Sequence, residues 1–480
     1  MFEWLPSVSQ HFMWSALAVL AYVLTTRIAR ERRAPATAVA WVLALALLPY
    51  VTLPLYFAFG RRKIRADRTD PMPARNPSAH WAAQLMTSFG LPPPGTARVR
   101  FHENGDVALA AFWELLDGAR REIAVSTFLI GNDEVGLAVL ARLTQRAREG
   151  IKVRLLLDGF GALFAPGKAR RELKAAGGSV AVFRPLFALR SVGPRNLRNH
   201  RKLLIVDGQR LWAGGRNLAR EYFSAHGNEA AWIDLSFDLE GPPAGAAAMQ
   251  FDRDWPATRR SVALAEPAAA PPVAEAIAKP PAQPPPPLAQ PLADTGAASN
   301  DFAADAQFLP SGPDQAEDTA QALLVDAFYR AQDRVLAVTP YFVPDDSLRT
   351  AMRLAVRRGV QITLVLPERS NHPLADFARA RPLRELASAG ADVRLVPAMV
   401  HAKAVVIDDS LALCGSINLD LRSLLLNHES AVLFYGPVEI DWLARWIDQL
   451  VQRGVPYAPS PPSLIRDLAE GMILTVAYQL

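Results

Sequence analysis

The chain has 480 residues, of which 50% are hydrophobic and 21% are charged, and its formal net charge is +5. At roughly 100–200 residues per domain this length predicts two or three folded units, and the composition excludes a wholly disordered or collagen-like chain. The small net charge is not that of a general nucleic-acid binder, and the single cysteine, Cys414, excludes an internal disulfide and a cysteine-based zinc site.

Residues 1–65 are predicted to form a membrane anchor with two apolar segments. Residues 39–59 carry no charge and are long enough, as a helix, to cross a hydrocarbon core of roughly 30 Å. Pro49 and Pro54 within them are tolerated in membrane spans. The shorter segment 12–26 is either a tilted span or a helix in the interface. A cleavable signal peptide is the alternative, but the first residues have no positive charge and no evident cleavage site.

Two basic clusters flank these segments, and both could also attract anionic lipid headgroups. They are Arg27, Arg30, Arg32 and Arg33 between the segments, and Arg61, Arg62, Lys63, Arg65 and Arg68 after the second. The second cluster favours the cytoplasmic side for the rest of the chain. The first would then lie outside, unless segment 12–26 lies in the interface.

Beyond residue 100, strand and helix patterns alternate, which predicts an α/β fold with a mixed or parallel sheet. The expected strands are 123–130, 151–157, 335–343 and 360–366, and the expected helices are 135–148 and 347–358. A first half spans 95–255 and a second half 301–480. Between them, residues 256–300 are rich in Ala and Pro and are predicted to be a semi-rigid or disordered linker, with a partner-docking polyproline segment as the alternative.

The two halves are repeats of one unit. The octet at 200–207 reads His-Arg-Lys-Leu-Leu-Ile-Val-Asp, and the octet at 401–408 reads His-Ala-Lys-Ala-Val-Val-Ile-Asp. At the same offset, Asn217 ends a Gly-Gly-Arg-Asn motif and Asn418 ends Gly-Ser-Ile-Asn. Later in each half, Asp234 and Glu429 each precede a Gly-Pro pair by the same distance. Duplicated apolar positions would suffice for a structural repeat, so the duplicated His and Lys indicate function.

The octets predict phosphoryl-transfer chemistry. On a strand, residues i and i+2 share a face, so each His lies beside its Lys. Two histidines brought together by a pseudo-twofold axis can act as nucleophile and as general acid. The lysines (Lys202, Lys403) and asparagines (Asn217, Asn418) suit the phosphate oxygens. A metal is unnecessary, and an ammonium group beside each His disfavours one.

Each imidazole also needs an acceptor that orients its second ring nitrogen. Asp207 and Asp408 are candidates by their place in the octets, although each could instead close the turn that follows it. Asp234 and Glu429 are better placed, each expected on a later strand of its own half. The sequence therefore offers two carboxylates per half for this role.

At these residues the chain resembles the phospholipase D superfamily and, within it, the bacterial cardiolipin synthases. Besides the octets, the resemblance includes the motifs at 195–202, 214–217, 221–222, 232–234, 251–255, 311–314, 339–345, 415–423 and 427–429, and the paired N-terminal apolar segments. It implies two pseudo-symmetric phospholipase D-like α/β halves that form one active site, preceded by an N-terminal transmembrane anchor.

The resemblance also implies roles for the residues. His200 would be the nucleophile that forms a phosphatidyl-histidine intermediate, and His401 would be the general acid and base. Lys202, Asp207, Lys403 and Asp408 of the octets would complete the catalytic set. The reaction would condense two phosphatidylglycerols to cardiolipin and release glycerol, without a cofactor. Some relatives take phosphatidylethanolamine as donor. The expected location is the inner membrane, with the catalytic halves facing the cytoplasm; the oligomeric state stays open.

Two features depart from the family pattern. The proline-rich linker is longer and more biased than expected. Arg216 stands where an apolar residue is more usual, and its side chain is expected to point outward, with a headgroup contact as the alternative.

Water or a lipid alcohol can resolve the intermediate, and a membrane anchor favours the lipid alcohol because it holds the site where lipid is abundant. Hydrolysis by a phospholipase D remains an alternative. A nuclease would need a basic groove with aromatic platforms, and neither is visible as a cluster. The apolar tail 464–480 is expected to pack on the core, with immersion in the interface as the alternative.

Overall fold

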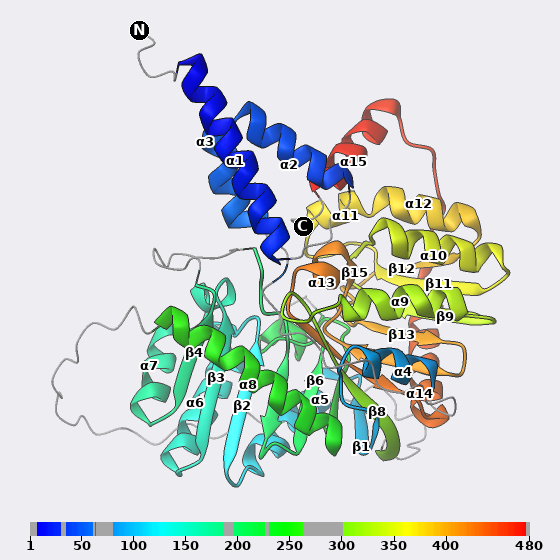
Figure 1. Cartoon of the computed structure of the whole chain (residues 1–480). Coiled ribbons are helices and arrows are strands. Elements are labelled where there is room, and N and C mark those ends of the chain that lie inside the picture. Colours follow the sequence, from blue (N-terminus) through cyan, green and yellow to red (C-terminus); the bar gives the residue numbers. More distant parts are fainter. Residues whose placement is uncertain are drawn as a thin grey trace.

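The computed structural model describes residues 7–29, 35–60, 63, 80–185, 196–225, 230–262 and 301–476. Beyond the N-terminal helices, two α/β halves share one 15-stranded sheet (Figure 1). The strands of the first half are β1 (Gly95–His102), β2 (Glu122–Thr127), β3 (Lys152–Asp158), β4 (Ser179–Phe183), β5 (Leu203–Val206), β6 (Arg210–Gly214) and β7 (Ser236–Glu240). Its helices are α5 (Gly105–Asp117), α6 (Glu134–Arg148), α7 (Gly167–Ala175) and α8 (Pro242–Val262).

The second half repeats this succession. Its strands in the large sheet are β8 (Asp301–Ser311), β9 (Arg334–Val338), β11 (Gln361–Pro367), β12 (Asp392–Val396), β13 (Ala404–Ile407), β14 (Leu411–Gly415), β16 (Glu429–Phe434) and β17 (Val455–Pro456), while β10 (Phe342–Val343) and β15 (Leu419–Asp420) form a separate pair. Its helices are α9 (Thr319–Arg330), α10 (Asp346–Arg357), α11 (Pro373–Ala378), α12 (Ala380–Ala389), α13 (Leu421–Leu425), α14 (Pro437–Arg453) and α15 (Leu464–Val476).

The strand order makes the duplication visible. From the antiparallel pair β1–β8 at the centre, the sheet continues outward as β7-β6-β5-β2-β3-β4 on one side and β16-β14-β13-β9-β11-β12 on the other. Each strand of the first half thus has a counterpart in the second, and β17 is added at one edge. The predicted α/β repeat is confirmed, and the octet strands β5 and β13 occupy equivalent central positions.

The strands form where buried apolar runs allow them. In β3, residues Leu155–Leu157 are all buried, as expected of a parallel strand covered on both faces. Helices α8 and α14 cover one face over both halves, and a single core cluster there joins residues of both. The opposite face has one core per half, beneath α5 and α6 in the first half and α9 and α10 in the second.

The boundary between the first half and the linker lies later than expected. Helix α8 continues to Val262, so the first residues assigned to the linker 256–300 extend this helix. Residues 263–300 lie outside the described residues, and β8 begins at Asp301.

The N-terminal segments differ from the expectation. Helix α1 (Val8–Ala29) is the one helix among the described residues with the length and apolar composition to cross a membrane, over Val8–Thr26. The segment expected to span, 39–59, is broken into α2 (Pro35–Leu47), α3 (Pro49–Leu55) and a π-helical turn at Tyr56–Gly60.

Proline explains the break, since a residue before proline is disfavoured in the α conformation. Leu48 precedes Pro49 and has φ −138° and ψ 60°. Tyr22 of α1 and Leu45 of α2 pack with Tyr56, so the segments form one small helical cluster. Most of the two basic clusters lies outside the described residues; Lys63 is described, and its ammonium group is 2.9 Å from the Asp318 carboxylate.

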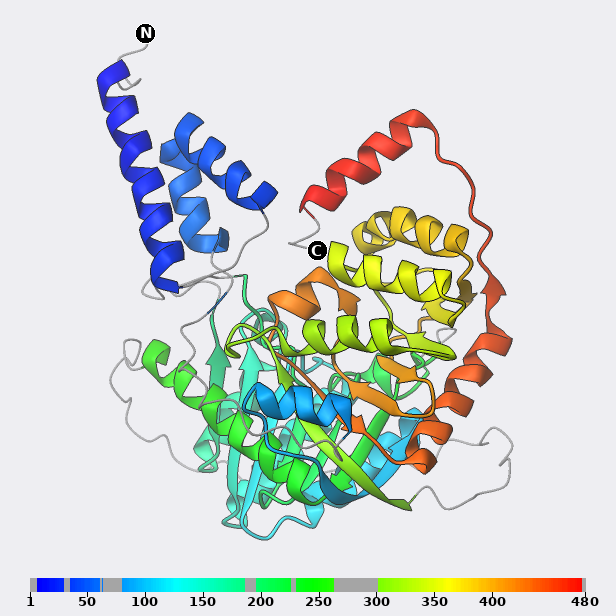
Figure 2. The ribbon, with the colours of Figure 1, turned by 45° about the vertical axis from the view of Figure 1, so that its right-hand side comes forward.

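The C-terminal helix α15 packs on the second half with one face only. Its Glu470 is fully buried against Arg384 of α12, and Ile473 packs near α11. The opposite face leaves Leu464, Ile465, Leu468 and Met472 exposed. Figure 2 shows α15 over α11 and α12, on the same side of the molecule as the N-terminal helices.

Candidate active site

The two octet histidines lie three residues before the equivalent strands β5 and β13, and each is held by the opposite half. The His200 amide donates to the His428 carbonyl at 2.8 Å, and the His401 amide donates to the Ile233 carbonyl at 2.7 Å. The approach to each octet therefore forms a short parallel bridge with the other half, Asn199 with His428 and Val400 with Ile233. These bonds bring residues about two hundred positions apart into one site.

The orienting carboxylates are exchanged between the halves. His200 Nδ1 lies 3.0 Å from Glu429 Oε1, and His401 Nδ1 lies 2.7 Å from Asp234 Oδ2. Each carboxylate is thus placed by its own half, on or near a later strand as expected, but serves the histidine of the other half. Neither half alone holds a complete histidine–carboxylate pair.

Glu429 is held as an anion by a dense set of donors. The hydroxyl groups of Ser416 and Ser423 donate to it at 2.5 and 2.7 Å, and the Asn427 amide donates at 3.2 Å. Burial acts to raise the pKa of Glu429, but His200, Lys202 and the Ser416 bond outweigh it and lower the pKa to about 2. The pKa of Asp234 is also lowered, because His401 and Lys403 outweigh its burial.

Burial keeps both imidazoles neutral near pH 7. It lowers the pKa of His200 to about 4, with Glu429 opposing this effect, and it lowers the pKa of His401 to about 3, with Lys403 adding to it. A neutral imidazole is the nucleophilic form. A phosphodiester anion near the second imidazole would favour its protonation, and the protonated imidazole is the form that a general acid requires.

The predicted phosphate-binding residues surround the two rings. Lys202 and Lys403 are almost fully buried, and burial lowers the pKa of Lys202 to about 8 and that of Lys403 to about 7. Lys403 Nζ is 3.1 Å from His401 Nε2. The Asn217 side-chain amide donates to the Tyr222 hydroxyl at 2.7 Å, and the Asn418 backbone N–H donates to the Ser423 hydroxyl at 2.9 Å. All four residues lie in the same buried region as the histidines.

Asp207 and Asp408 are placed elsewhere, which corrects their expected catalytic role. The Asp207 carboxylate accepts the backbone N–H groups of Arg120, Arg121 and Glu122, and the Asp408 carboxylate accepts those of residues 332–334. Each Asp lies seven positions after its His, about 23 Å away along an extended chain at 3.3 Å per residue. Both adopt a left-handed φ, 54° and 48°, and close the turn at the far end of the strand.

The sequence led us to expect that Arg216 points outward or contacts a headgroup. The structure shows neither. Arg216 is 1% exposed, and its guanidinium donates to the carbonyls of Tyr222, His102, Glu103 and Asp234. Its place under Asp234 ties the His401 partner to the loop that carries Asn217. The residues around Arg216 in the sequence do not indicate this role, because a buried arginine that donates to backbone carbonyls leaves no local pattern.

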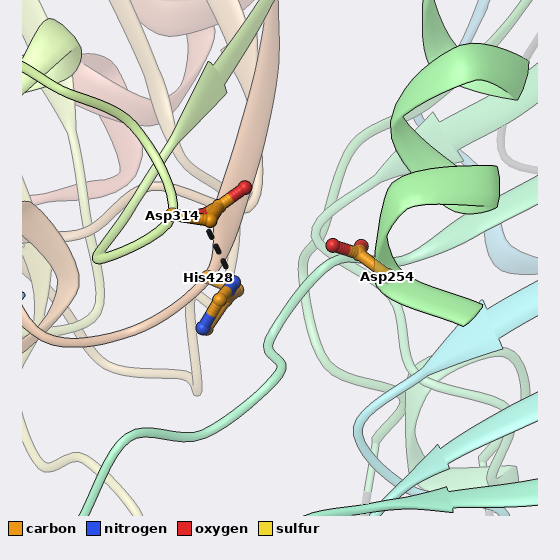
Figure 3. A group of neighbouring side chains, drawn as sticks. All are labelled: Asp254, Asp314 and His428. Carbon is orange, nitrogen blue, oxygen red and sulfur yellow. Dashed lines mark ion pairs between the residues drawn. The ribbon is translucent and has the colours of Figure 1, made fainter. Parts of the chain in front are cut away.

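A buried ion-pair network adjoins the site, and the sequence analysis assigned no role to it. The Arg201 guanidinium lies 2.7 Å from Asp254 and 3.1 Å from Asp314, and His428 Nδ1 lies 2.9 Å from Asp314 (Figure 3). Asp254, Asp314 and His428 have ligand atoms close enough for a metal. Arg201 already supplies the positive charge there, so the chemistry is that of an ion-pair network. All four residues occur in the family motifs, and this was the only indication of the network in the sequence.

Comparisons with known proteins agree with this geometry. The family model described as cardiolipin synthase, phospholipase D-like domain, matches residues 112–255 and 324–451, and the model described as phospholipase D-nuclease N-terminal matches residues 16–61. The phosphatidylserine synthase structure from Haemophilus influenzae covers 83% of the chain, and the chain covers all of it, with a TM-score of 0.59 and 14% identity. The structural likeness shows a shared fold, and the family model places the chain in the phospholipase D-like class.

Curated relatives narrow the class. Cardiolipin synthase A of Pseudomonas fluorescens (strain SBW25) is 30% identical over 88% of this chain and 86% of its own length. Cardiolipin synthase A of Pseudomonas entomophila (strain L48) is 29% identical over 87% of this chain and 85% of its own length. The chain belongs to the phospholipase D-like cardiolipin synthase family.

Proposed function

We propose that this protein is a membrane-bound phosphatidyl transferase that makes cardiolipin from two phosphatidylglycerol molecules and releases glycerol. The observation that carries the proposal is the pair of neutral imidazoles, His401 buried and His200 largely buried, each oriented by an anionic carboxylate from the opposite half. Family membership and an N-terminal apolar helix support a lipid substrate in a membrane.

The reaction proceeds in two displacements on phosphorus. In the first, His200 attacks the phosphorus of phosphatidylglycerol, and the bond from phosphorus to the glycerol headgroup oxygen breaks. His401, protonated as the anionic substrate binds, gives its proton to this oxygen, and glycerol leaves. In the second, the free hydroxyl of another phosphatidylglycerol attacks the phosphorus. His401 takes the hydroxyl proton, and the bond to His200 breaks to release cardiolipin.

The buried charges stabilise both transition states. Lys202 and Lys403 would offset the charge that develops on the non-bridging oxygens, and the Asn217 and Asn418 amides would donate hydrogen bonds to them. Asp234 and Glu429 stabilise the positive charge that forms on the imidazoles. These groups are fixed before the substrate arrives, so the reaction needs little reorganisation.

The test uses the purified full-length chain in vesicles of phosphatidylglycerol, with and without phosphatidylethanolamine. We expect cardiolipin and glycerol as products; ethanolamine release would identify phosphatidylethanolamine as donor, and phosphatidic acid as main product would identify a hydrolase. His200→Ala and His401→Ala should each lower product formation by at least about a thousandfold. His80→Asn is the matched control, because His80 caps α4 (Trp81–Ser88) and its ring contacts Trp81 and Tyr435 rather than the octet histidines. Retained activity in either alanine variant overturns the proposal.

We further propose that the protein lies in the inner membrane with its catalytic halves facing the cytoplasm. The basic residues between 61 and 68 support this orientation by the positive-inside rule. The native Cys414 is buried, so single cysteines introduced at exposed positions of α14 can be labelled selectively. Labelling in intact spheroplasts by an impermeant reagent, without lysis, would contradict the orientation.

A further inference from the structure

An apolar turn lies near His200 and is connected to it through the ring of Phe128. The residues that follow β3 form a 3₁₀ turn at Gly161–Leu163, and Phe160, Leu163 and Phe164 on it are 45%, 51% and 56% exposed. Three large apolar side chains on one short turn form an exposed patch of the kind that marks an interaction surface.

Aromatic contacts connect this turn to His200. The Phe128 ring meets the His200 ring edge-on, with centroids 4.9 Å apart, and stacks on Phe160 at 6.0 Å. The Phe160 ring in turn contacts Phe164 at 5.4 Å. A continuous apolar path therefore leads from the reacting imidazole to the surface.

The turn is rigidly attached to the catalytic loop. The buried Asp158 carboxylate accepts the Phe160 amide N–H with one oxygen and the Asn199 amide N–H with the other, both at 2.8 Å. Gly161 packs so closely on the Phe128 carbonyl that a Cβ there would lie 1.7 Å from it. The same carboxylate thus sets the position of the apolar turn and of the residue before His200.

The equivalent rim of the second half is more polar. Strand β11 is the counterpart of β3, and the five residues that follow it are Glu368, Arg369, Ser370, Asn371 and His372. All but Ser370, which is half-buried, are exposed, and Leu374 after them is one exposed apolar side chain. The rim on the side of His200 therefore has three exposed large apolar residues, and the mostly polar rim on the side of His401 has one.

We infer that Phe128, Phe160, Leu163 and Phe164 form a seat for the acyl chains of the phospholipid whose phosphate lies at His200. The inference rests on the proposed function, which places a phosphatidyl group on this histidine. Such a group ends in two acyl chains, and the apolar path is the surface continuous with its point of attachment. Helix α13 and strand β15, which follow Asn418 of the site, lie on the side of the molecule that faces the N-terminal helices (Figure 1).

Acyl-chain length provides the test. Full-length Phe160→Gln/Phe164→Gln is assayed in detergent micelles on phosphatidylglycerol with oleoyl chains and with hexanoyl chains. We expect kcat/KM to fall about tenfold or more for the oleoyl substrate and by less than about threefold for the hexanoyl one. Phe160→Leu/Phe164→Leu should retain most of the oleoyl activity, because it keeps the seat apolar. Tyr329→Ala, an exposed aromatic on α9, is the matched control.

The outcomes separate the seat from other roles and from the proposed function itself. An equal loss on both substrates would mean that the turn only supports His200, and no loss on either would mean that the chains bind elsewhere; both results overturn the inference. If the wild-type protein makes phosphatidic acid and no cardiolipin, the transferase proposal fails. The chain-length comparison then still tests the seat, with phosphatidic acid as the measured product.

Discussion

The carboxylate beside each catalytic imidazole comes from the opposite half of the chain, and this exchange governs what single substitutions should do. Glu429 is surrounded by hydroxyl and amide donors, whereas Asp234 lies over the Arg216 guanidinium. The two histidines therefore have chemically different supports, although the octets that carry them are nearly symmetric. A substitution in one half should act on the imidazole of the other.

We predict that His200 is energetically coupled to Glu429 and not to Asp234. Glu429→Gln and Asp234→Asn should each lower the turnover rate by about 100- to 10,000-fold, since each leaves an imidazole unoriented. In double-mutant cycles of unfolding free energy, His200→Asn with Glu429→Gln should show a coupling of about 0.5–3 kcal/mol. His200→Asn with Asp234→Asn should be additive within about 0.5 kcal/mol. The reverse pattern would contradict the exchanged pairing.

The buried histidines also predict a pH dependence of stability. Their native pKa values, about 4 and about 3, lie below the ordinary value of about 6.5, so the unfolded chain binds protons that the native protein does not. This contribution to stability is complete above pH 6.5 and is lost as the pH falls toward 4. Between pH 6.5 and 5, each histidine should lower the free energy of unfolding by up to about 2 kcal/mol.

The measurement compares thermal unfolding of the wild type with His200→Gln/His401→Gln over this window. The wild-type melting temperature should fall more steeply with decreasing pH than that of the variant. Asp420, whose pKa burial raises to about 6, acts in the opposite direction, but it is present in both proteins and cancels in the difference. Parallel curves would show that the imidazoles titrate normally in the native state.

At the scale of the elements, the turn after each octet strand has a structural function. Asp207 accepts three backbone N–H groups at the start of β2, and Asp408 accepts three before and at the start of β9. We predict that Asp207→Ala and Asp408→Ala each destabilise the protein by about 1–3 kcal/mol, because they leave these donors without their acceptor.

The turnover rate per folded molecule should stay within about threefold of the wild type in both variants. Unfolding curves and active-site titration measure the two quantities separately. A large loss of rate in a fully folded Asp207→Ala protein would restore a catalytic role to this carboxylate.

At the scale of the whole molecule, the central pair β1–β8 makes one sheet of the two halves, and the Arg201 network joins them beside the site. This network links α8 of the first half to Asp314, after β8 of the second. We predict that Arg201→Met destabilises the protein by about 3–5 kcal/mol, since two buried carboxylates lose their counter-charge. Arg201→Met/Asp254→Asn/Asp314→Asn should be more stable than Arg201→Met alone. A triple variant that is less stable than the single one would contradict the account.

The sequence by itself determined the repeated α/β architecture, the two octets and the residues that we propose to bind phosphate, because apolar runs and duplicated motifs are written along the chain. It did not determine which carboxylate serves which histidine, the burial of Arg216, or the apolar seat beside His200. These depend on contacts between residues that are distant in the chain, and only the packing of one half on the other decides them. The break at Leu48 is local. A proline is compatible with either a kinked span or a broken one, and the packing of α1, α2 and α3 favours the broken one.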